Sequence, residues 1–225
     1  MKISVICSNY NSSQWIDTYL DSLNNQFLHE FEVIFVDANS TDSSIDKILN
    51  FEFREGISTL ILTLKERVGI YEAWNRAIKI SRGDYIVNYN TDDHLFQSSL
   101  QTYTSYIERL PHVDLFYGPC CVTSEEGSVI GMRNWPGYSH EILKELCICG
   151  PFPCVKKSVI EEAGYFNTKY KSSSDYDMWL KLSSLNKSFM RMEEVLGSFC
   201  YREGSVSNSS LVEAQADDLE IQSKY

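Results

Sequence analysis

Residues 83–95 read GDYIVNYNTDDHL, an apolar run that ends at two adjacent carboxylates, Asp92 and Asp93. The apolar part predicts a buried strand, and neither carboxylate helps to bury it. Two interpretations of the acidic pair are open. The carboxylates form a solvated turn or a helix N-cap, or they bind a cation or a polar substrate at the carboxyl end of a sheet.

Strand-like and helix-like segments alternate four times up to this acidic pair. Short apolar runs predict strands at residues 2–7, 31–37, 58–64 and 84–90. Apolar residues at helical spacing predict helices between them, at about 15–23, 45–54 and 70–81. This alternation is typical of right-handed βαβ units on a parallel sheet, so we expect an α/β fold.

The pattern is less regular after Asp93. Residues 113–122 and 128–134 predict two strands joined by a turn, which indicates an antiparallel addition to the sheet. The other expected elements are helices at about 96–109, 139–147, 158–163 and 172–185, strands at 189–192 and 194–202, and an acidic, weakly helical tail at 211–225. No internal repeat or linker divides the chain, so we expect a single domain over residues 1–225.

Composition excludes several classes of protein. With 225 residues, 43% of them apolar, the chain can bury a substantial core. Its formal net charge of −11 argues against binding to nucleic acid along the phosphate backbone. There is no run of about 18 apolar residues and no signal-peptide pattern at the amino terminus, so we expect a cytoplasmic protein.

The seven cysteines are therefore expected to be reduced. Cys147, Cys149 and Cys154, with His140 upstream, offer the ligand types of a zinc site. Their spacing is not a paired C-x-x-C arrangement, and buried cysteines commonly act as small apolar residues. Packing is the preferred interpretation.

Polar side chains follow three of the four predicted strands. Ser8 and Tyr10 follow the first, Asp37 ends the second, and Asp92 and Asp93 follow the fourth. Because the carboxyl ends of parallel strands share one edge, these side chains are expected to converge, and their carboxylates need a partner that offsets repulsion. Oxygen ligands predict Mg²⁺ or Mn²⁺, which proteins usually hold with one or two carboxylates and substrate phosphates.

A nucleoside diphosphate fits such a site. The sequence contains no G-x-x-x-x-G-K-[ST] and no G-x-G-x-x-G after the first strand, so the metal would have to hold the phosphates. A metal-bound diphosphate is a good leaving group, which favours group transfer to an acceptor hydroxyl. Asp175 is a candidate base, since it lies in the first turn of a predicted helix after small residues. Stabilisation of that helix end by its charge explains Asp175 equally well.

These residues resemble the family 2 inverting glycosyltransferases of GT-A fold. The resemblance lies in four stretches: SVICSNYNSSQWIDTYLDSLNNQ, FEVIFVDANSTDSS, GIYEAWNRAIKISRGDYIVNYNTDD and GPFPCVKKSVIEEAGYFNTKYKSSSDYDMWLKL. It implies a Rossmann-like, mostly parallel sheet flanked by helices, with a smaller antiparallel subdomain on the acceptor side. It also implies a nucleotide-sugar donor, a divalent metal and transfer with inversion.

The resemblance assigns the nucleotide pocket to Ser8, Tyr10 and Asp37, with Asn75 in the stretch that lines the donor site. Many relatives carry a second carboxylate after the second strand, where this chain has Ala38. If that position contacts the nucleobase, the usual uracil contact is absent.

The resemblance assigns the metal motif to residues 90–93. Asp93 binds the metal, Asp92 faces the ribose or phosphate, and Asn90 replaces an acidic residue at the first position. Asparagine keeps an oxygen ligand and removes a charge, which lowers the expected metal affinity. Asp175 falls on the base of the family, and Arg202 on a segment that contacts the diphosphate.

By this resemblance, residues of about 1–95 bind the donor, about 96–205 form the acceptor side, and 206–225 form a tail. The expected donor is a UDP-sugar, and the expected acceptor is a saccharide or lipid-linked saccharide of surface polysaccharide or lipopolysaccharide biosynthesis. The setting is the cytoplasm, with peripheral association to the inner face of the membrane left open. Two alternatives remain: a nucleotidyltransferase, which usually has a Gly-rich basic loop after its first strand, and a non-catalytic nucleotide-sugar-binding regulator, which does not need Asp175.

Overall fold

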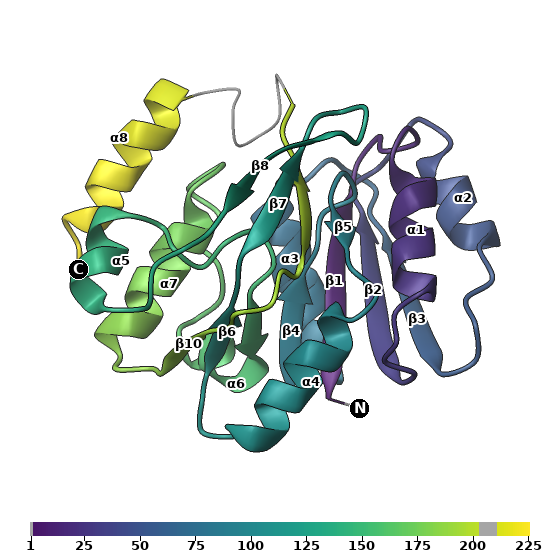
Figure 1. The fold of residues 1–225 in the computed structure, drawn as a ribbon. Coiled ribbons are helices and arrows are strands. Elements are labelled where there is room, and N and C mark those ends of the chain that lie inside the picture. Colours follow the sequence, from purple (N-terminus) through teal and green to yellow (C-terminus); the bar gives the residue numbers. More distant parts are fainter. Residues whose placement is uncertain (1, 203–210) are drawn as a thin grey trace.

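The computed structural model describes residues 2–202 and 211–225, and its centre is a seven-stranded sheet (Figure 1). Within this sheet all neighbouring strands run parallel except β9, which is antiparallel to both of its neighbours. The strand order is β10 (Phe189–Arg191), β6 (Leu115–Tyr117), β9 (Cys154–Lys156), β4 (Tyr85–Asn88), β1 (Ile3–Asn9), β2 (Phe31–Asp37) and β3 (Ile57–Thr63). The expected mostly parallel α/β sheet is thereby confirmed.

Helices cover both faces of this sheet (Figure 1). Along β1, Val5 and Cys7 belong to one apolar cluster and Ile6 to the other, because successive strand side chains point to opposite faces. The Val5 face packs against α1 (Ile16–Asn24), α2 (Ser44–Asn50) and α4 (Ser99–Arg109). The Ile6 face packs against α3 (Ile70–Ile80), α5 (His140–Glu145), α6 (Lys157–Glu162), α7 (Ser174–Ser184) and α8 (Leu211–Gln222). Strands buried on both faces need mostly apolar residues, as β1, β2 and β4 have. The polar exceptions inside β1 and β2, Ser4 and Glu32, are hydrogen-bonded to each other at 2.6 Å.

A second, four-stranded sheet lies beside the carboxyl end of β4. Its strand order is β5 (His94–Leu95), β11 (Gly197–Cys200), β7 (Cys120–Thr123) and β8 (Val129–Arg133). The expected antiparallel pair is present as β7 and β8, but β7 and β11 run parallel, so this sheet is mixed.

The strand expected at 113–122 is a correction. It divides into β6 in the large sheet and β7 in the small one, with Gly118 and Pro119 between them. Proline lacks the N–H that a strand ladder needs. A Cβ at Gly118 would lie 3.1 Å from the carbonyl oxygen of Glu194, so the chain passes close to the segment before β11.

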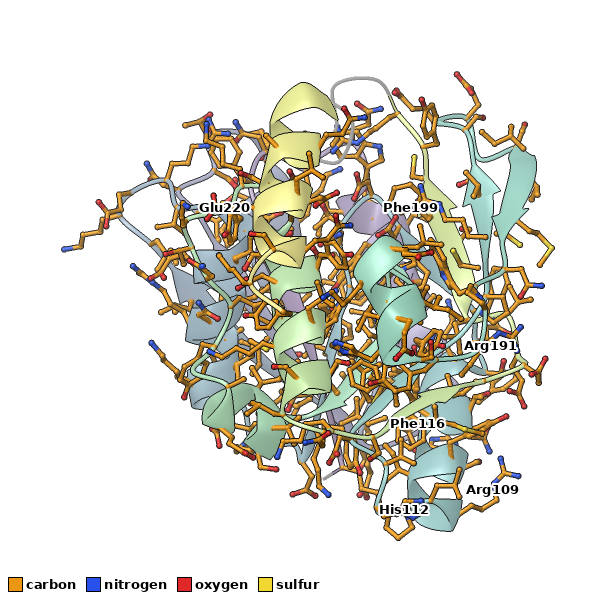
Figure 2. The ribbon with its side chains drawn as sticks, turned by 90° about the vertical axis from the view of Figure 1, so that its left-hand side faces the viewer. Arg109, His112, Phe116, Arg191, Phe199 and Glu220 are labelled. Carbon is orange, nitrogen blue, oxygen red and sulfur yellow. The ribbon has the colours of Figure 1, made fainter. Side chains whose placement is uncertain are left out.

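Two helices also differ from expectation. The helix expected to reach residue 54 ends at Asn50, and the weakly helical tail forms a 12-residue helix, α8. This last helix lies along α7, toward the viewer in Figure 2, where Glu220 is labelled. Within residues 2–202 and 211–225, each helix is too short or too polar to cross a lipid bilayer.

The strand order places the three polar strand ends side by side. Because β1 lies between β2 and β4, the chain that leaves each of these strands emerges at the same edge. Asn9 of β1 is in register with Asp37 of β2, and the amide of Tyr89 bonds the carbonyl of Ile6. The predicted convergence of Ser8, Asp37 and the 90–93 segment is therefore a property of the fold.

Candidate functional site

The ends of β1 and β2 form a polar corner around Asp37. We call it saturated because both oxygens of the Asp37 carboxylate have hydrogen-bond partners. Asp37 is 3% exposed, and its carboxylate accepts hydrogen bonds from the Asn9 amide at 2.6 Å and from the Ser40 amide N–H and hydroxyl at 3.1 and 2.5 Å. The Asn9 amide also donates to Ser44, and its oxygen accepts from Ser12. Every oxygen of this carboxylate has a partner, so Asp37 is held rigidly at the edge.

The loops after β1 and β2 each contain a left-handed asparagine and are joined by a second carboxylate, Asp42. Asn11 and Asn39 have φ of 49° and 63°, values that asparagine tolerates better than most residues. Asp42 accepts from the amides of Ser13 and Ser44 at 2.8 and 2.9 Å. Burial alone would raise its pKa, but these hydrogen bonds outweigh burial and hold the pKa of Asp42 at about 2. This bonded loop fixes the chain on either side of Tyr10.

Tyr10 is the exposed member of this corner, with 37% of its surface accessible. The guanidinium of Arg67, from the connection between β3 and α3, lies 4.3 Å from the centre of the Tyr10 ring. Ser8, two residues before Tyr10 on β1, is half-buried. Arg67 was not found by sequence reasoning, although Lys65 and Arg67 place basic residues directly after the third strand. An aromatic face beside a cation can contact a nucleobase and its phosphates.

The turn after β4 contains two buried oxygens without partners. Asp93 is 4% exposed; its Oδ1 accepts from the amide of Cys200 at 3.1 Å, whereas its Oδ2 has no hydrogen-bond partner within the described residues. The side-chain oxygen of Asn90 is likewise buried and without a partner there. The Tyr89 hydroxyl donates to the Asp93 carbonyl at 2.9 Å and so fixes the turn. Buried polar atoms of native proteins nearly always have partners. Six other buried polar atoms of the described residues also lack one, but Asn90 and Asp93 place two such oxygens in one turn, where they can act together as ligands.

The electrostatics of this turn point to a cation. Burial and the neighbouring Asp92 raise the pKa of Asp93 well above its ordinary value, although the Cys200 amide, Arg133 and Arg202 act in the opposite direction. Asp92 itself pairs with Arg202, Oδ2 to Nε, at 2.8 Å. The Arg202 guanidinium also lies 4.5 Å from the centre of the Trp15 ring.

The donor set fits a hard divalent cation. Within the described part of the chain there is no cluster of three or more His, Cys, Asp or Glu residues. Asn90 and Asp93 therefore supply at most a partial coordination shell, which suits Mg²⁺ or Mn²⁺ because these ions are commonly completed by water and substrate phosphate. A structural zinc site needs four protein ligands and does not fit.

Asp175 lies in the first turn of α7, as predicted. Its Oδ1 accepts from the Tyr71 hydroxyl and from the Tyr176 amide, both at 3.0 Å. Part of Asp175 remains accessible to solvent. Loss of hydration around its carboxyl nevertheless raises the pKa of Asp175 above the ordinary aspartate value. The Tyr71 and Tyr176 bonds lower that pKa, and the charge of Asp218 raises it further. A carboxyl with a raised pKa is a stronger proton acceptor.

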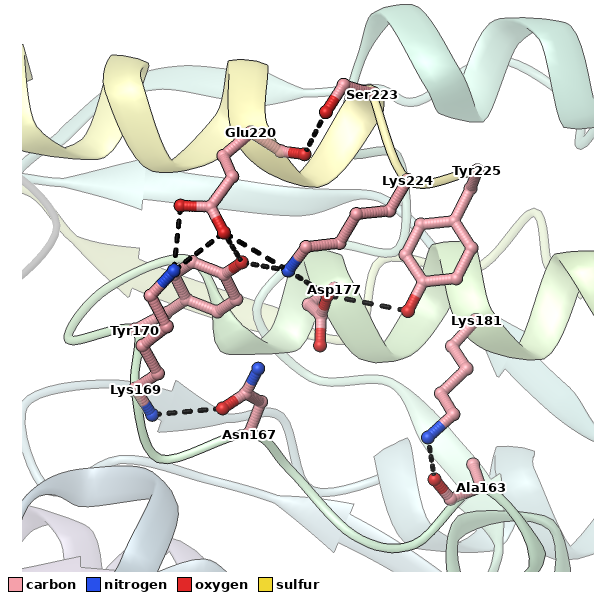
Figure 3. Close-up of polar contacts among 10 residues, drawn as sticks. All are labelled: Ala163, Asn167, Lys169, Tyr170, Asp177, Lys181, Glu220, Ser223, Lys224 and Tyr225. Carbon is pink, nitrogen blue, oxygen red and sulfur yellow. Dashed lines mark hydrogen bonds and ion pairs between the residues drawn. The ribbon is translucent and has the colours of Figure 1, made fainter.

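Sequence reasoning missed Tyr71 and Asp218, which belong to α3 and α8. Tyr71 stands about 100 residues before Asp175, and its hydroxyl also contacts the carbonyl of Ser172 at 2.8 Å. Nothing in the local sequence predicts these contacts. Asp177, two residues after Asp175, has different partners, Lys224 and Tyr225 (Figure 3).

Asn75 is placed differently from the other candidates. It is buried on α3, where its amide donates to the Phe166 carbonyl at 2.8 Å and accepts from the Phe166 amide at 2.9 Å. Both ends of the side chain thus hold the connection between α6 and α7. A contact between Asn75 and the donor stays a prediction.

The cysteines are all reduced, and the sheet separates Cys154 from Cys147 and Cys149. Cys149 packs in the Ile6-side cluster and Cys154 in the Val5-side cluster. The ring of His140 contacts the hydroxyl of Ser183 at 2.7 Å. The preferred interpretation, packing, is consistent with these positions for Cys149 and Cys154.

Two surface hollows lie away from the strand ends. One, of about 430 Å³, is lined by Trp135, Tyr138 and Arg191 among others, and the second, of about 620 Å³, by Tyr138, His140 and Asn186 among others. Neither contains a residue of the predicted site. We therefore place the candidate site at the polar side chains that follow the strands, which lie outside both hollows.

A comparison with models of protein families identifies the family of this chain. The family model for glycosyl transferase family 2 matches residues 4–161, which include the strand ends described above. The chain belongs to glycosyl transferase family 2, as the sequence resemblance implied.

Curated relatives include polysaccharide-forming enzymes. The chain is 29% identical over 184 residues to a chondroitin synthase of Escherichia coli, covering 81% of this chain and 26% of the relative. It is 27% identical over 210 residues to the amylovoran biosynthesis glycosyltransferase AmsB of Erwinia amylovora, covering 88% of this chain and 69% of that protein. The chain thus spans about a quarter of the synthase and about two thirds of AmsB.

Solved structures share the fold. Residues 1–349 of Staphylococcus aureus TarS, in complex with UDP-GlcNAc, match with a TM-score of 0.80 and 24% identity, over 98% of this chain and 64% of that one. The mannosyltransferase PcManGT from Pyrobaculum calidifontis, in complex with GDP-Man and Mn²⁺, matches with a TM-score of 0.71 and 18% identity, over 91% and 58%.

Proposed function

We propose that this chain transfers a sugar from a nucleotide-sugar donor to a hydroxyl of a saccharide or lipid-linked saccharide, with inversion at the anomeric carbon. The observation that carries the proposal is that Asn90 and Asp93 each have a buried oxygen without a partner among residues 2–202 and 211–225, at the sheet edge of a family 2 chain. A UDP-sugar is the favoured donor, because TarS is described in complex with UDP-GlcNAc. The names of the chondroitin synthase and of AmsB support a role in polysaccharide biosynthesis.

On the donor side, Asp93 and Asn90 would hold Mn²⁺ or Mg²⁺ through their unpartnered oxygens. When bound, such an ion offsets the negative charge of the leaving diphosphate. Asp92 and Arg202 form an ion pair beside this position, and we assign Asp92 to the ribose or phosphate and Arg202 to the diphosphate. Lower metal affinity than in an all-carboxylate site is expected, because Asn90 contributes no charge.

The nucleobase is assigned to Tyr10 and Arg67, with Ser8 and Asp37 beneath them. Ala38 is fully buried, and its amide donates to the Asn9 carbonyl at 2.8 Å. Alanine at position 38 has no carboxylate to offer the nucleobase. We propose that the exposed Tyr10 ring, beside the Arg67 guanidinium, contacts the nucleobase in its place.

On the acceptor side, Asp175 is the base. As the acceptor oxygen forms its bond to the anomeric carbon, Asp175 takes the hydroxyl proton, and the bond from that carbon to the diphosphate oxygen breaks with its electron pair leaving on the diphosphate. Tyr71 and the Tyr176 amide both bond Oδ1, so we assign the proton to Oδ2. These two bonds hold the carboxylate in one orientation, which favours attack along a single line.

The substitution Asp175→Asn tests this assignment. We expect sugar transfer to fall by about 10²- to 10⁴-fold, the range of general base catalysis, with UDP and Mn²⁺ still shifting the melting temperature. Asp46→Asn is the matched control, since Asp46 is an exposed aspartate in the first turn of α2 and tests the loss of helix-end charge alone. Near-normal transfer by a folded Asp175→Asn variant would exclude Asp175 as the base.

The same assay separates the enzyme from a non-catalytic nucleotide-sugar-binding regulator. Both would be stabilised by a nucleoside diphosphate with Mn²⁺ in a thermal-shift screen. Only the enzyme would transfer the sugar, or release it slowly to water when the acceptor is left out. Binding without either reaction would favour the regulator.

A further inference from the structure

Trp15 lies at the N-terminal boundary of α1, directly after the loop that leaves β1. Its amide donates to the Ser12 carbonyl at 2.9 Å, and its carbonyl accepts from the Tyr19 amide at 3.1 Å. The Ser12 hydroxyl in turn donates to the side-chain oxygen of Asn9 in the saturated corner. The backbone of Trp15 is therefore fixed by α1 on one side and by the corner on the other.

The loop before Trp15 is also bonded to the chain around α2. The Ser13 amide donates to Asp42 at 2.8 Å, and the Ser13 carbonyl accepts from the Lys47 ammonium at 2.9 Å. Lys47 also pairs with Asp17 of α1 at 2.6 Å. Because the surroundings hold its backbone in place, the Trp15 side chain can position another group precisely.

The Trp15 ring contacts an arginine from near the other end of the chain. The guanidinium carbon of Arg202 lies 4.5 Å from the centre of the Trp15 ring, and Nε of Arg202 pairs with Oδ2 of Asp92 at 2.8 Å. The Arg202 and Asp92 side chains are 26% and 16% exposed, so water screens this cluster only in part. An arginine has five N–H donors, and a contact with a ring face uses none of them.

The backbone that carries Arg202 is tied to its surroundings just before this residue. The Cys200 amide donates to Oδ1 of Asp93 at 3.1 Å, and the Tyr201 amide donates to the Thr123 carbonyl at 2.8 Å. These bonds fix the backbone, but a long arginine side chain still loses much conformational freedom when it is held in one place. The contacts with Trp15 and Asp92 select the position of the guanidinium at the acidic turn.

We propose that Trp15 is a positioning residue for donor binding: its ring holds the Arg202 guanidinium at the acidic turn, where Arg202 meets the diphosphate of the donor. This rests on the proposed assignment of Arg202 to the diphosphate. An incoming diphosphate competes with the Asp92 carboxylate for the N–H groups of Arg202. The ring contact does not depend on those groups, so it keeps the guanidinium in place during the exchange.

Two substitutions at Trp15 separate the aromatic face from simple packing. Trp15→Leu keeps an apolar side chain and removes the ring, whereas Trp15→Phe keeps a ring. Isothermal titration with Mn²⁺ present compares the binding of UDP with that of uridine. We expect Trp15→Leu to weaken UDP binding by about three- to tenfold. Its affinity for uridine should be unchanged, because uridine has no diphosphate.

Trp15→Phe should bind UDP within about twofold of the wild type, because a smaller ring still attracts the guanidinium. Equal losses in the Phe and Leu variants would contradict a role of the ring face. In transfer assays, Trp15→Leu should raise the KM for the sugar donor and leave the KM for the acceptor unchanged. A purely structural role of Trp15 would not distinguish UDP from uridine or donor from acceptor.

Tyr106→Leu is the matched control, because it removes a ring that lies 4.6 Å from the Arg109 guanidinium on α4, away from the strand ends. Its UDP affinity should equal that of the wild type. Arg202→Ala provides the second comparison: the double variant with Trp15→Leu should bind UDP about as weakly as Arg202→Ala alone, because the ring acts through the guanidinium. Thermal melting verifies that each variant is folded.

The inference is overturned if folded Trp15→Leu binds UDP as tightly as the wild type, or if it loses affinity for uridine to the same extent. It is also overturned if the losses from Trp15→Leu and Arg202→Ala multiply in the double variant. Failure of the proposed function is distinct, since it would appear as no sugar transfer by a wild type that still binds UDP. A loss specific to UDP, absent in Tyr106→Leu, supports the inference.

Discussion

Asp37 and Asp93 are both almost fully buried carboxylates near the carboxyl ends of strands in one sheet, yet their surroundings differ. Asp37 is bonded by Asn9 and Ser40, and the loop around it is closed by Asp42 and Asn11. Asp93 has one bonded oxygen and one without a partner in the described chain, beside the unpartnered oxygen of Asn90. The fully bonded corner holds Tyr10 in place, whereas the turn with unpartnered oxygens is the proposed position of the metal. We therefore expect substitutions at the corner to affect stability and substitutions at the turn to affect activity.

The largest effect is expected from Asp93→Asn. The amide retains an acceptor for the Cys200 N–H but removes the charge that would hold the metal, so sugar transfer should fall by about 10²- to 10³-fold. The melting temperature without metal should not fall, because a buried charge without a partner is itself unfavourable. Steady-state transfer assays and thermal melting measure the two parts. A large loss of stability with normal transfer would show that Asp93 has a structural role and would contradict the proposed role in binding.

The second effect concerns stability. Mn²⁺ together with UDP should raise the free energy of unfolding of the wild type. At a concentration of Mn²⁺ with UDP 100 times the Kd, the gain is about 2.7 kcal/mol. The gain should disappear in Asp93→Asn, and Asn90→Asp should reach it at a lower metal concentration because a charge is restored. Melting curves over a metal titration provide the measurement. An unchanged metal response in Asp93→Asn would place the ion elsewhere.

At the saturated corner, Asn9→Ala should lower the free energy of unfolding by about 2 kcal/mol. The Asn9 amide is buried and bonds Asp37, Ser40 and Ser44, and its loss leaves buried groups without partners. Urea denaturation measures the change. Asn25→Ala, which removes an exposed bond to the Asp21 carbonyl, is the control and should cost less than about 0.5 kcal/mol. Equal losses in the two variants would argue against a rigid corner.

The smallest effect is expected at the exposed rim of the corner. Arg67→Ala removes the cation beside Tyr10 and should weaken UDP binding by about 0.5–1 kcal/mol, or roughly two- to fivefold. Arg109→Ala removes a similar cation from the Tyr106 ring at 4.6 Å on α4 and serves as the control. Isothermal titration with UDP distinguishes them. Equal affinity of both variants would remove Arg67 from the nucleotide pocket.

Much of the amino-terminal half could be predicted because its signals are local. Mostly apolar runs identify β1, β2 and β4, whose side chains are buried on both faces of the sheet. The alternation of strands and helices then determines which ends share an edge. Tyr10, Asp37 and Asp93 follow as candidates from their positions at those ends.

The division of residues 113–122 between two sheets could not be predicted in the same way. β6 and β7 both have strand-like sequences, and the choice of sheet depends on partners far along the chain: β10 for β6 and β11 for β7. Gly118 and Pro119 interrupt the ladder, but a break in one strand does not say where the next one pairs.

The sequence by itself determined the α/β alternation, the acidic turn after β4 and the candidate base in the first turn of a helix, because each depends on neighbours within a few residues. Only the tertiary structure decided which of these carboxylates are saturated and which are not. Asp37 is bonded by Ser40, three residues away, and by Asn9, 28 residues away, whereas Cys200 for Asp93 and Tyr71 for Asp175 are each about 100 residues away. Such contacts arise when helices and strands pack, and local periodicity carries no information about them.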